Sequence, residues 1–273
     1  MNMGKCISER RRALGYTQQK LAEKLHVSFQ SVSKWENGTS YPDITVLPQI
    51  AAVLNISVDA LLGYPSQSIT HYDDRYRTEG YYWGLTPNHL CYDIMRQKPP
   101  TSPLRVLDIG CGEGKDAVFL ARNGYLVTAF DASEQGLSKA KALAAHCGVR
   151  VDFFRADIKD YRPETNFDII FSSGVFHYIP TALRAPIIDS LKSHTAPGGL
   201  HVLNVFVKKP FIPAPPDAEE GELTAGDWRS GELYLHYHDW RLHKIEERIF
   251  NCQSGGTPHQ HCMDILIAEK PIC

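Results

Sequence analysis

A glycine-rich segment, LDIGCGEG at residues 107–114, constrains the fold of this chain more than any other feature. It ends an apolar run of strand length and comes directly before a helical stretch. Glycines let the backbone approach a ligand closely, and the first turn of the following helix offers unpaired amide donors. An acid, Asp108, precedes the glycines, and their spacing differs from the dinucleotide fingerprint because only one residue separates Gly112 from Gly114. The segment predicts a ligand-binding loop between a strand and a helix.

Strand-length and helical stretches alternate along the rest of this part of the chain. The predicted strands are LRVLDIG, YLVTAFD, VDFFRAD, FDIIFSS and GLHVLNVFV, with helices such as KDAVFLARNG and SEQGLSKAKALAAHCG between them. A proline-rich insertion, KKPFIPAPPDAEEGE, follows the fifth strand, and RLHKIEERIFN leads to a last strand, HQHCMDILIAEKP. This alternation is typical of an α/β fold in which a mostly parallel sheet is covered by helices on both faces.

Acids also end the second and third predicted strands. Asp131 follows Asp108 by 23 residues, at about the position where a Rossmann-like fold places a carboxylate for ribose hydroxyls. The side chain of Asp157 and the backbone amide that follows it are able to hold the amine and ring nitrogen of adenine. These positions point to a ligand that contains adenine and ribose.

Five motifs, VLDIGCGEG, AFDAS, RADI, FDIIFSSGVFHYI and the PGG within residues 196–199, occur in the order seen in class I methyltransferases. Residues 75–273 resemble that family. The resemblance implies a Rossmann-like fold with a seven-stranded, mostly parallel sheet, and S-adenosyl-L-methionine as the cofactor. It implies that Asp108 and the glycine loop surround the amino-acid part, that Asp131 binds the ribose, and that Asp157 with Ile158 meets the adenine. The expected cofactor residues are Asp108, Gly110, Cys111, Gly112, Gly114, Asp131, Ala132, Asp157, Ile158 and Ser173. A Rossmann-like domain that has lost its ligand and a nicotinamide enzyme stay open as alternatives.

Within that family, YYWGLTPNHLCYDIM and ARNGYLVTAFD look like segments of the tellurite-resistance (TehB-type) methyltransferases. The chain departs from them at Phe250 and Asn251, where the His-Arg pair associated with TehB chemistry falls by alignment. The methyl acceptor, a small molecule or an oxyanion, therefore stays open. A DNA methyltransferase is disfavoured, because SSGVFHYIP stands where a base-flipping Asn/Asp-Pro-Pro-Tyr/Phe motif belongs.

His177, just past the fourth predicted strand, is the candidate catalytic residue. The carboxyl edge of such a sheet binds substrate, and an imidazole there is able to accept a proton or to contact the cofactor carboxylate. A polar loop residue that only packs is the alternative. The aromatic residues Tyr81, Tyr82 and Trp83 are expected in the core, with a cation–π contact to the sulfonium as the alternative.

Histidines and a cysteine near the C-terminus raise the question of a metal. The residues concerned are His236, His238, Asp239, His259, His261 and Cys262. A His-x-His pair on a strand puts both rings on one face. A closed metal site, however, needs four ligands, each oriented by a hydrogen bond to a further residue. We expect no metal and interpret these residues as acceptor-pocket lining or surface.

The N-terminal part, residues 5–62, reads as short helices with no strand pattern. Thr17 and Ser28 are expected to cap the second and third helices, with His26 in the turn between them, since histidine tolerates the left-handed region better than most residues. Val32 and Trp35 are expected to face inward.

The segment GYTQQKLAEKLHVSFQSVSKWENGTSYPDI is similar to the helix-turn-helix of the Cro and phage-repressor (XRE) family. The resemblance implies double-stranded DNA as a partner, with the third helix in the major groove. The implied DNA-binding residues are Gln18, Ser28, Phe29, Gln30, Ser33, Lys34 and Asn37. Gln18 and Asn37 would contact phosphate, and Gln30 and Lys34 would read bases. A helical bundle kept for protein contacts is the alternative.

These patterns predict a DNA-binding domain at residues 1–66, a polar linker at 67–74 and a methyltransferase domain at 75–273. No stretch is apolar enough to span a membrane and no signal peptide is apparent, so the expected location is the cytoplasm. The seven cysteines form no CxxC pair, which favours reduced thiols. A homodimer is possible. A transcriptional regulator whose second domain only senses S-adenosyl-L-methionine or another small ligand is the alternative function.

Overall fold

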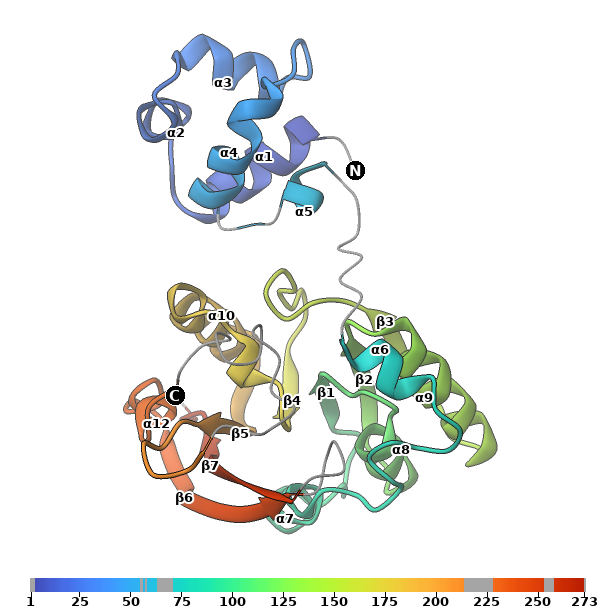
Figure 1. Cartoon of the computed structure of the whole chain (residues 1–273). Coiled ribbons are helices and arrows are strands. Elements are labelled where there is room, and N and C mark those ends of the chain that lie inside the picture. The colour runs from blue at the N-terminus through green and yellow to red at the C-terminus, as the bar shows by residue number, and fades with distance from the viewer. Residues whose placement is uncertain are drawn as a thin grey trace. The chain divides into compact units, whose positions relative to one another are not determined.

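The computed structural model describes residues 3–54, 56, 58–62, 71–213, 228–252 and 258–272. The chain divides into two compact units, Met1–Ser68 and Ile69–Cys273 (Figure 1). Each unit has its own hydrophobic core.

The described residues of the first unit form helices joined by turns. Its elements are α1 (Met3–Ala13), α2 (Gln18–Leu25), α3 (Phe29–Glu36), a 3-10 turn η1 (Ile44–Val46), α4 (Leu47–Val53) and α5 (Val58–Leu62). The two predicted caps are confirmed, because the side chains of Thr17 and Ser28 accept hydrogen bonds from the amides of Lys20 and Ser31. His26 adopts the left-handed conformation, with φ of 55° and ψ of 38°, as expected for the turn.

Apolar side chains from all five helices fill the interior of the first unit. They include Ile7, Leu21, Leu25, Val32, Trp35, Ile50, Leu54 and Leu61. One ion pair is buried with them: the guanidinium of Arg11 on α1 donates two hydrogen bonds to the carboxylate of Glu36, at 2.5 and 2.9 Å. This pair fixes the end of α3 against the first helix.

The second unit is an α/β fold around a seven-stranded sheet with the order β3-β2-β1-β4-β5-β7-β6. The strands are β1 (Arg105–Ile109), β2 (Leu126–Asp131), β3 (Asp152–Arg155), β4 (Phe167–Ser172), β5 (Thr195–Val207), β6 (Arg241–Cys252) and β7 (His259–Glu269). Strands β1 to β5 are parallel, and β7 is antiparallel to both β5 and β6. The predicted Rossmann-like architecture with a mostly parallel seven-stranded sheet is confirmed.

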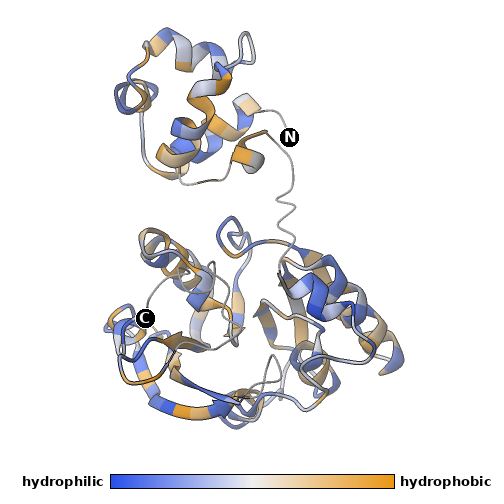
Figure 2. Ribbon diagram, viewed as in Figure 1, coloured by the Kyte–Doolittle hydropathy of each residue, from blue (hydrophilic) through white to orange (hydrophobic). Residues whose placement is uncertain are grey.

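Helices cover both faces of this sheet. They are α6 (His71–Tyr76), α7 (His89–Gln97), α8 (Lys115–Arg122), α9 (Glu134–His146), η2 (Phe176–Tyr178), α10 (Thr181–Ser193) and α12 (Glu232–Leu235). Side chains of α7 and α8 pack on one face, and those of α10 and α12 pack on the other. The edge strand β6 is different, since polar residues outnumber apolar ones along it and none of its residues is buried (Figure 2). Charged side chains on an edge strand discourage pairing with another chain.

Two expectations from the sequence need correction. Residues 71–74, predicted as linker, lie in α6, where Asp73 is buried and accepts a hydrogen bond of 2.5 Å from Ser133. A polar segment can thus form an ordered helix when its polar groups find buried partners. Trp83, expected in the core, is 43% exposed. Residues 214–227 of the proline-rich insertion lie outside the described residues, and none of the described helices is long and apolar enough to cross a membrane.

Candidate active site at the carboxyl edge of the sheet

The glycine loop follows β1 at the carboxyl edge of the parallel strands. Gly110 and Gly112 have φ of 72° and 52°, which L side chains rarely adopt. A Cβ at Gly110 would stand 2.1 Å from the side chain of Val175, and one at Gly112 would stand 2.7 Å from the hydroxyl of Tyr76. Glycine is therefore required here both by backbone conformation and by the close approach of two other segments.

Asp108 lies near the end of β1 and is almost fully buried, with 2% exposure. Its Oδ2 atom has no hydrogen-bond partner among the described residues. Burial raises the pKa of this carboxyl well above its usual range, and the negative charge of Asp116 adds to the effect. A buried carboxylate oxygen without a partner is unfavourable unless a donor or a cation reaches it.

Asp131, at the end of β2, holds the glycine loop in position. Its two carboxylate oxygens accept hydrogen bonds of 2.8 Å from the amides of Gly112 and Ser133. Burial raises the pKa of Asp131, and these amide hydrogen bonds oppose the rise. Each carboxylate oxygen has a second lone pair, so the group is still able to accept hydrogen bonds from ligand hydroxyls.

Asp157, the third acid expected at the site, binds the nearby Lys159. Asp157 accepts a hydrogen bond of 2.9 Å from the amide of Lys159 and forms an ion pair of 3.0 Å with its ammonium group. The side chain of Ile158 is buried in the core below. Ala132, between Asp131 and Ser133, accepts a hydrogen bond from Arg155 through its carbonyl oxygen.

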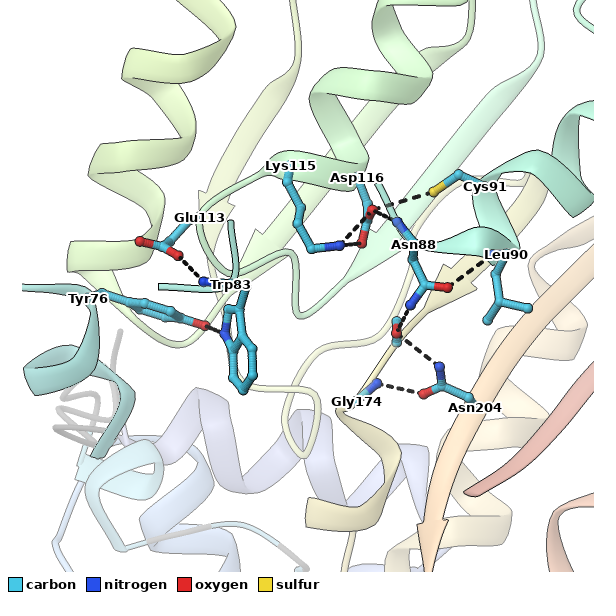
Figure 3. A network of polar contacts seen from close by, with 11 residues as sticks. Tyr76, Trp83, Asn88, Leu90, Cys91, Glu113, Lys115, Asp116, Gly174 and Asn204 are labelled. Atoms are coloured by element: carbon cyan, nitrogen blue, oxygen red, sulfur yellow. Dashed lines mark hydrogen bonds and ion pairs between the residues drawn. The ribbon is translucent and has the colours of Figure 1, made fainter. Parts of the chain in front are cut away.

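Ser173, directly after β4, joins Asn88 and Asn204, which are labelled in Figure 3, in one polar network. Its hydroxyl oxygen accepts hydrogen bonds of 2.8 Å from Asn88 and 2.9 Å from Asn204. Asn204 in turn accepts a hydrogen bond of 2.7 Å from the amide of Gly174. Because both lone pairs of the Ser173 oxygen are engaged, its own hydrogen is directed elsewhere and is able to reach a ligand.

The segment before α7 is fastened to the glycine loop and to α8 (Figure 3). The amide of Trp83 donates to Glu113 at 3.3 Å, and its indole donates to Tyr76 at 3.2 Å. Further along, the amide of Asn88 donates to Asp116 at 2.6 Å. The segment thereby forms one wall of the site. The sequence located this segment by its similarity to TehB, but gave no role to Asn88, Glu113, Asp116 or Asn204.

Aromatic rings lie between α6 and η2. The hydroxyl groups of Tyr72 and Tyr178 are 2.7 Å apart, which connects the helix before the sheet to the turn after β4. The ring of Tyr72 also packs near those of Tyr76 and Trp83, with centroids 5.7 and 6.3 Å apart. Trp83 therefore packs among these rings instead of in the core, whereas Tyr81 packs against the buried residues Val118 and Leu143.

His177 in η2 is flanked by two rings, Tyr178 at 4.0 Å and Phe206 at 4.7 Å. Its Nδ1 atom is buried and has no hydrogen-bond partner among the described residues. Burial lowers the pKa of His177 to about 3, and the nearby His261 contributes. The imidazole is consequently neutral at pH 7 and suited to hydrogen bonding rather than to carrying charge.

The structure separates the histidine-rich residues that the sequence grouped together. Lys192 on α10 binds the carbonyl of His236 and the carboxylate of Asp239, at 2.9 and 2.5 Å. His259 and His261 instead lie with Cys252, and all three ligand atoms are within 4.8 Å of one another. Cys262 is buried in the core below β7. Cys252 was not considered from the sequence because it lies seven residues away on the preceding strand.

The helix α3 of the first unit presents an outer side that is polar except for Phe29. Phe29, Gln30, Lys34 and Asn37 are exposed and Ser33 is half-buried, while Val32 and Trp35 point into the core as expected. Ser28 uses its hydroxyl to cap the helix. Gln18 donates a hydrogen bond of 2.8 Å to Glu36 and so joins the buried Arg11 pair.

Comparison with known protein families found one match in each unit. Residues 106–199 match the family model "Methyltransferase domain", and residues 7–61 match the model "Helix-turn-helix". The first unit thus contains a segment similar to helix-turn-helix domains, and the second unit contains one similar to methyltransferase domains.

Within that class, the second unit is similar to TehB. A probable S-adenosyl-L-methionine-dependent methyltransferase TehB of Haemophilus influenzae is 23% identical over 196 residues, which are 72% of this chain and 63% of that protein. The crystal structure of TehB from H. influenzae superposes with a TM-score of 0.59 at 22% identity and covers 73% of this chain and 66% of that one.

Two further relatives widen the comparison. Hemagglutinin 1 of Eikenella corrodens is 30% identical over 193 residues, 69% of this chain and 61% of that protein. A Burkholderia thailandensis 1,6-didemethyltoxoflavin-N1-methyltransferase with bound S-adenosylhomocysteine has a TM-score of 0.52 at 19% identity, over 67% of this chain and 77% of that one. The chain spans about three fifths of the length of the first curated relatives.

Proposed function

We propose that the second unit is an S-adenosyl-L-methionine-dependent methyltransferase, and that the first unit binds specific double-stranded DNA. The observation that carries the enzymatic part is the Oδ2 atom of Asp108, buried beside the glycine loop without a partner among the described residues. A cationic ligand would relieve the cost of burying this oxygen. S-adenosyl-L-methionine carries two cationic groups, a sulfonium and an α-ammonium.

The residues of the carboxyl edge fit the parts of this cofactor. Asp108 and the amides of the glycine loop would hold the amino-acid part, and Asp131 would accept hydrogen bonds from the ribose hydroxyls. Asp157 and the amide of Ile158 would meet the adenine. Trp83, half-exposed beside Tyr76, offers an aromatic face to a cation. When bound, the cofactor supplies an electrophilic methyl group.

The acceptor is proposed to be a small molecule or an oxyanion that binds near His177. A neutral imidazole with a buried Nδ1 atom is able to accept a hydrogen bond from an acceptor hydroxyl or thiol and so to orient it for in-line attack. An oxyanion has no proton to lose, so its methylation would depend less on His177.

A binding and turnover experiment on the full chain tests the enzymatic proposal. Calorimetry should detect binding of S-adenosyl-L-methionine to the wild-type chain. Asp131→Ala should lower the binding affinity roughly tenfold or more, because a charge-assisted hydrogen bond is worth about 1.5 to 3 kcal/mol. Asp152→Ala, at an exposed acid that begins β3, is the matched control and should bind normally. Labelled cofactor with tellurite, phenols and thiols would then identify the product.

The outcomes separate the proposal from its main alternative. Cofactor binding without turnover on any acceptor, but with a change in DNA affinity, would mean that the second unit senses the ligand instead of using it. Unchanged cofactor affinity in Asp131→Ala would contradict the assignment of Asp131 to the ribose.

We also propose that the protein is cytoplasmic and forms a homodimer. Cell fractionation tests the location, and sedimentation of the purified chain tests the oligomeric state.

A further inference from the structure

Cys252, His259 and His261 come together on the hairpin formed by β6 and β7. In the strand register Cys252 is directly opposite His259, and Phe250 is opposite His261. Residues two apart on a strand share a face, so both imidazoles and the thiol project to the same side. Their ligand atoms all lie within 4.8 Å of one another, and all three residues are half-buried.

The two imidazoles approach each other through their ligating atoms. The Nε2 atoms of His259 and His261 are 2.9 Å apart, and the ring planes cross at 86°. At this distance only one of the two nitrogens can carry a hydrogen, so at least one lone pair points into the space between the rings. A metal ion bound by both nitrogens would use the lone pairs of both rings.

The surroundings favour a buried, ordered ion over a loosely held one. The rings of Phe206 and Phe250 lie 4.8 and 5.8 Å from that of His261. Such apolar rings lower the local dielectric on this side and strengthen the attraction between a cation and a thiolate. Phe206 also contacts His177 at 4.7 Å, so the cluster is close to the proposed acceptor-binding edge of the sheet.

We propose that Cys252, His259 and His261 bind a thiophilic divalent cation, for which Zn²⁺ is the best match. One sulfur and two imidazole nitrogens are ligands that Zn²⁺ prefers, and three protein ligands are the usual number in a site with an open fourth position. On binding, the Cys252 thiol releases its proton to solvent and coordinates as thiolate. The open position is then available to water or to a thiol or hydroxyl of the acceptor.

Cys262 provides a built-in control for this assignment. It is next to His261 in sequence, but it lies on the opposite face of β7 in the core, with 2% exposure. A site inferred from sequence spacing alone would include Cys262, whereas the structure selects Cys252.

Cobalt and zinc binding to the tag-free, metal-stripped full chain tests the proposal. We expect about one Co²⁺ per chain, with tetrahedral d–d bands and a thiolate-to-cobalt charge-transfer band, and displacement of the cobalt by Zn²⁺. Cys252→Ser should abolish the charge-transfer band, and His261→Asn should weaken Zn²⁺ binding more than about tenfold, since even indirect partners of a ligand contribute that much. Cys262→Ser should retain both signals.

Several results would overturn the site. These are no binding of either metal by the wild-type chain at micromolar concentration, a charge-transfer band that persists in Cys252→Ser, or loss of the band in Cys262→Ser. Zn²⁺ should also raise the Tm of the wild-type chain but not that of His259→Asn, which gives a second readout if the cysteine variant does not fold. S-adenosyl-L-methionine affinity, measured on the same samples, separates failure of this site from failure of the proposed methyltransferase function.

Discussion

His201 is buried in β5, and its hydrogen-bond partners define its chemical state. Thr195 donates its only hydroxyl hydrogen to the carbonyl of Leu191, so it must accept from the Nε2–H of His201, at 2.8 Å. The Nδ1 atom therefore has no hydrogen and accepts from the hydroxyl of Tyr237 at 2.7 Å. Both nitrogens of the neutral ring are satisfied, and a second proton would break one of these bonds.

This residue should make the second unit sensitive to acid. Burial, with help from Lys192 and Lys270, lowers the pKa of His201 from 6.5 to about 3. Because the unfolded chain binds the proton more tightly, the stabilisation is complete above about pH 6.5 and is lost as the pH falls toward 3, at up to about 1.4 kcal/mol per unit. Urea unfolding of wild type and His201→Asn at several pH values measures the difference. Parallel pH profiles for the two proteins would contradict this account.

The buried pair of Arg11 and Glu36 should control the stability of the first unit. Their side chains are 10% and 4% exposed. Glu36→Gln leaves the guanidinium buried without its countercharge, which typically costs about 3 to 5 kcal/mol. Thermal unfolding of the full chain should show the helical unit melting early. Glu9→Gln removes an exposed pair with Lys5 and should change stability by less than about 1 kcal/mol, and an equal loss in both variants would argue against burial as the cause.

At the scale of elements, the turn between β1 and α8 depends on close packing as well as on backbone conformation. Gly110→Ala adds a methyl group 2.1 Å from Val175 at a φ of 72°. Gly148 has a similar φ of 66° but nothing within 4 Å of an added Cβ. Gly148→Ala should therefore cost only the left-handed strain of about 1 to 2 kcal/mol, and Gly110→Ala should cost about 1 to 3 kcal/mol more.

Urea unfolding and cofactor calorimetry measure the two glycine variants. Combining Gly110→Ala with Val175→Ala should recover part of the loss, because it removes the closest atoms. No recovery, with equal costs at both glycines, would mean that backbone strain alone explains the requirement.

At the scale of the whole molecule, one short recognition helix reads only a few base pairs. We predict that the full chain binds specific DNA as a dimer, on half-sites about one helical turn or some 34 Å apart. Lys34 on the exposed side of α3 should read bases, so Lys34→Ala should relax preference at its position by about 1 to 3 kcal/mol. Gln18→Ala should weaken binding to all DNA sequences alike, although it also removes a hydrogen bond to Glu36.

Selection from a random DNA library and sedimentation of the complex test this arrangement. Both Gln18→Ala and wild type should enrich the same motif, whereas Lys34→Ala should enrich a more degenerate one. If the wild-type chain enriches no motif, with and without cofactor, then the first unit serves another purpose.

Local sequence determined the features that depend on neighbouring residues. Thr17 and Ser28 cap their helices because each side-chain oxygen reaches the amide three positions ahead. His26 ends α2 in the left-handed conformation, where its backbone amide donates to the carbonyls of Ala22 and Glu23. The alternation of strands and helices predicted the parallel sheet. Two parallel strands need a crossover connection, and helical stretches of suitable length lie between predicted strands in the sequence. Which strand ends would carry acids was visible as well.

Only the tertiary structure decided which distant side chains meet. Asn88 and Ser173 are 85 residues apart in the chain, and no local pattern links an amide before α7 to a hydroxyl after β4. The same holds for Cys252, which the antiparallel register of β6 and β7 sets opposite His259, while strand alternation turns the adjacent Cys262 to the other face. Sequence spacing specifies the face of an element, but the pairing of elements, fixed by packing of the whole core, specifies the neighbour across from it.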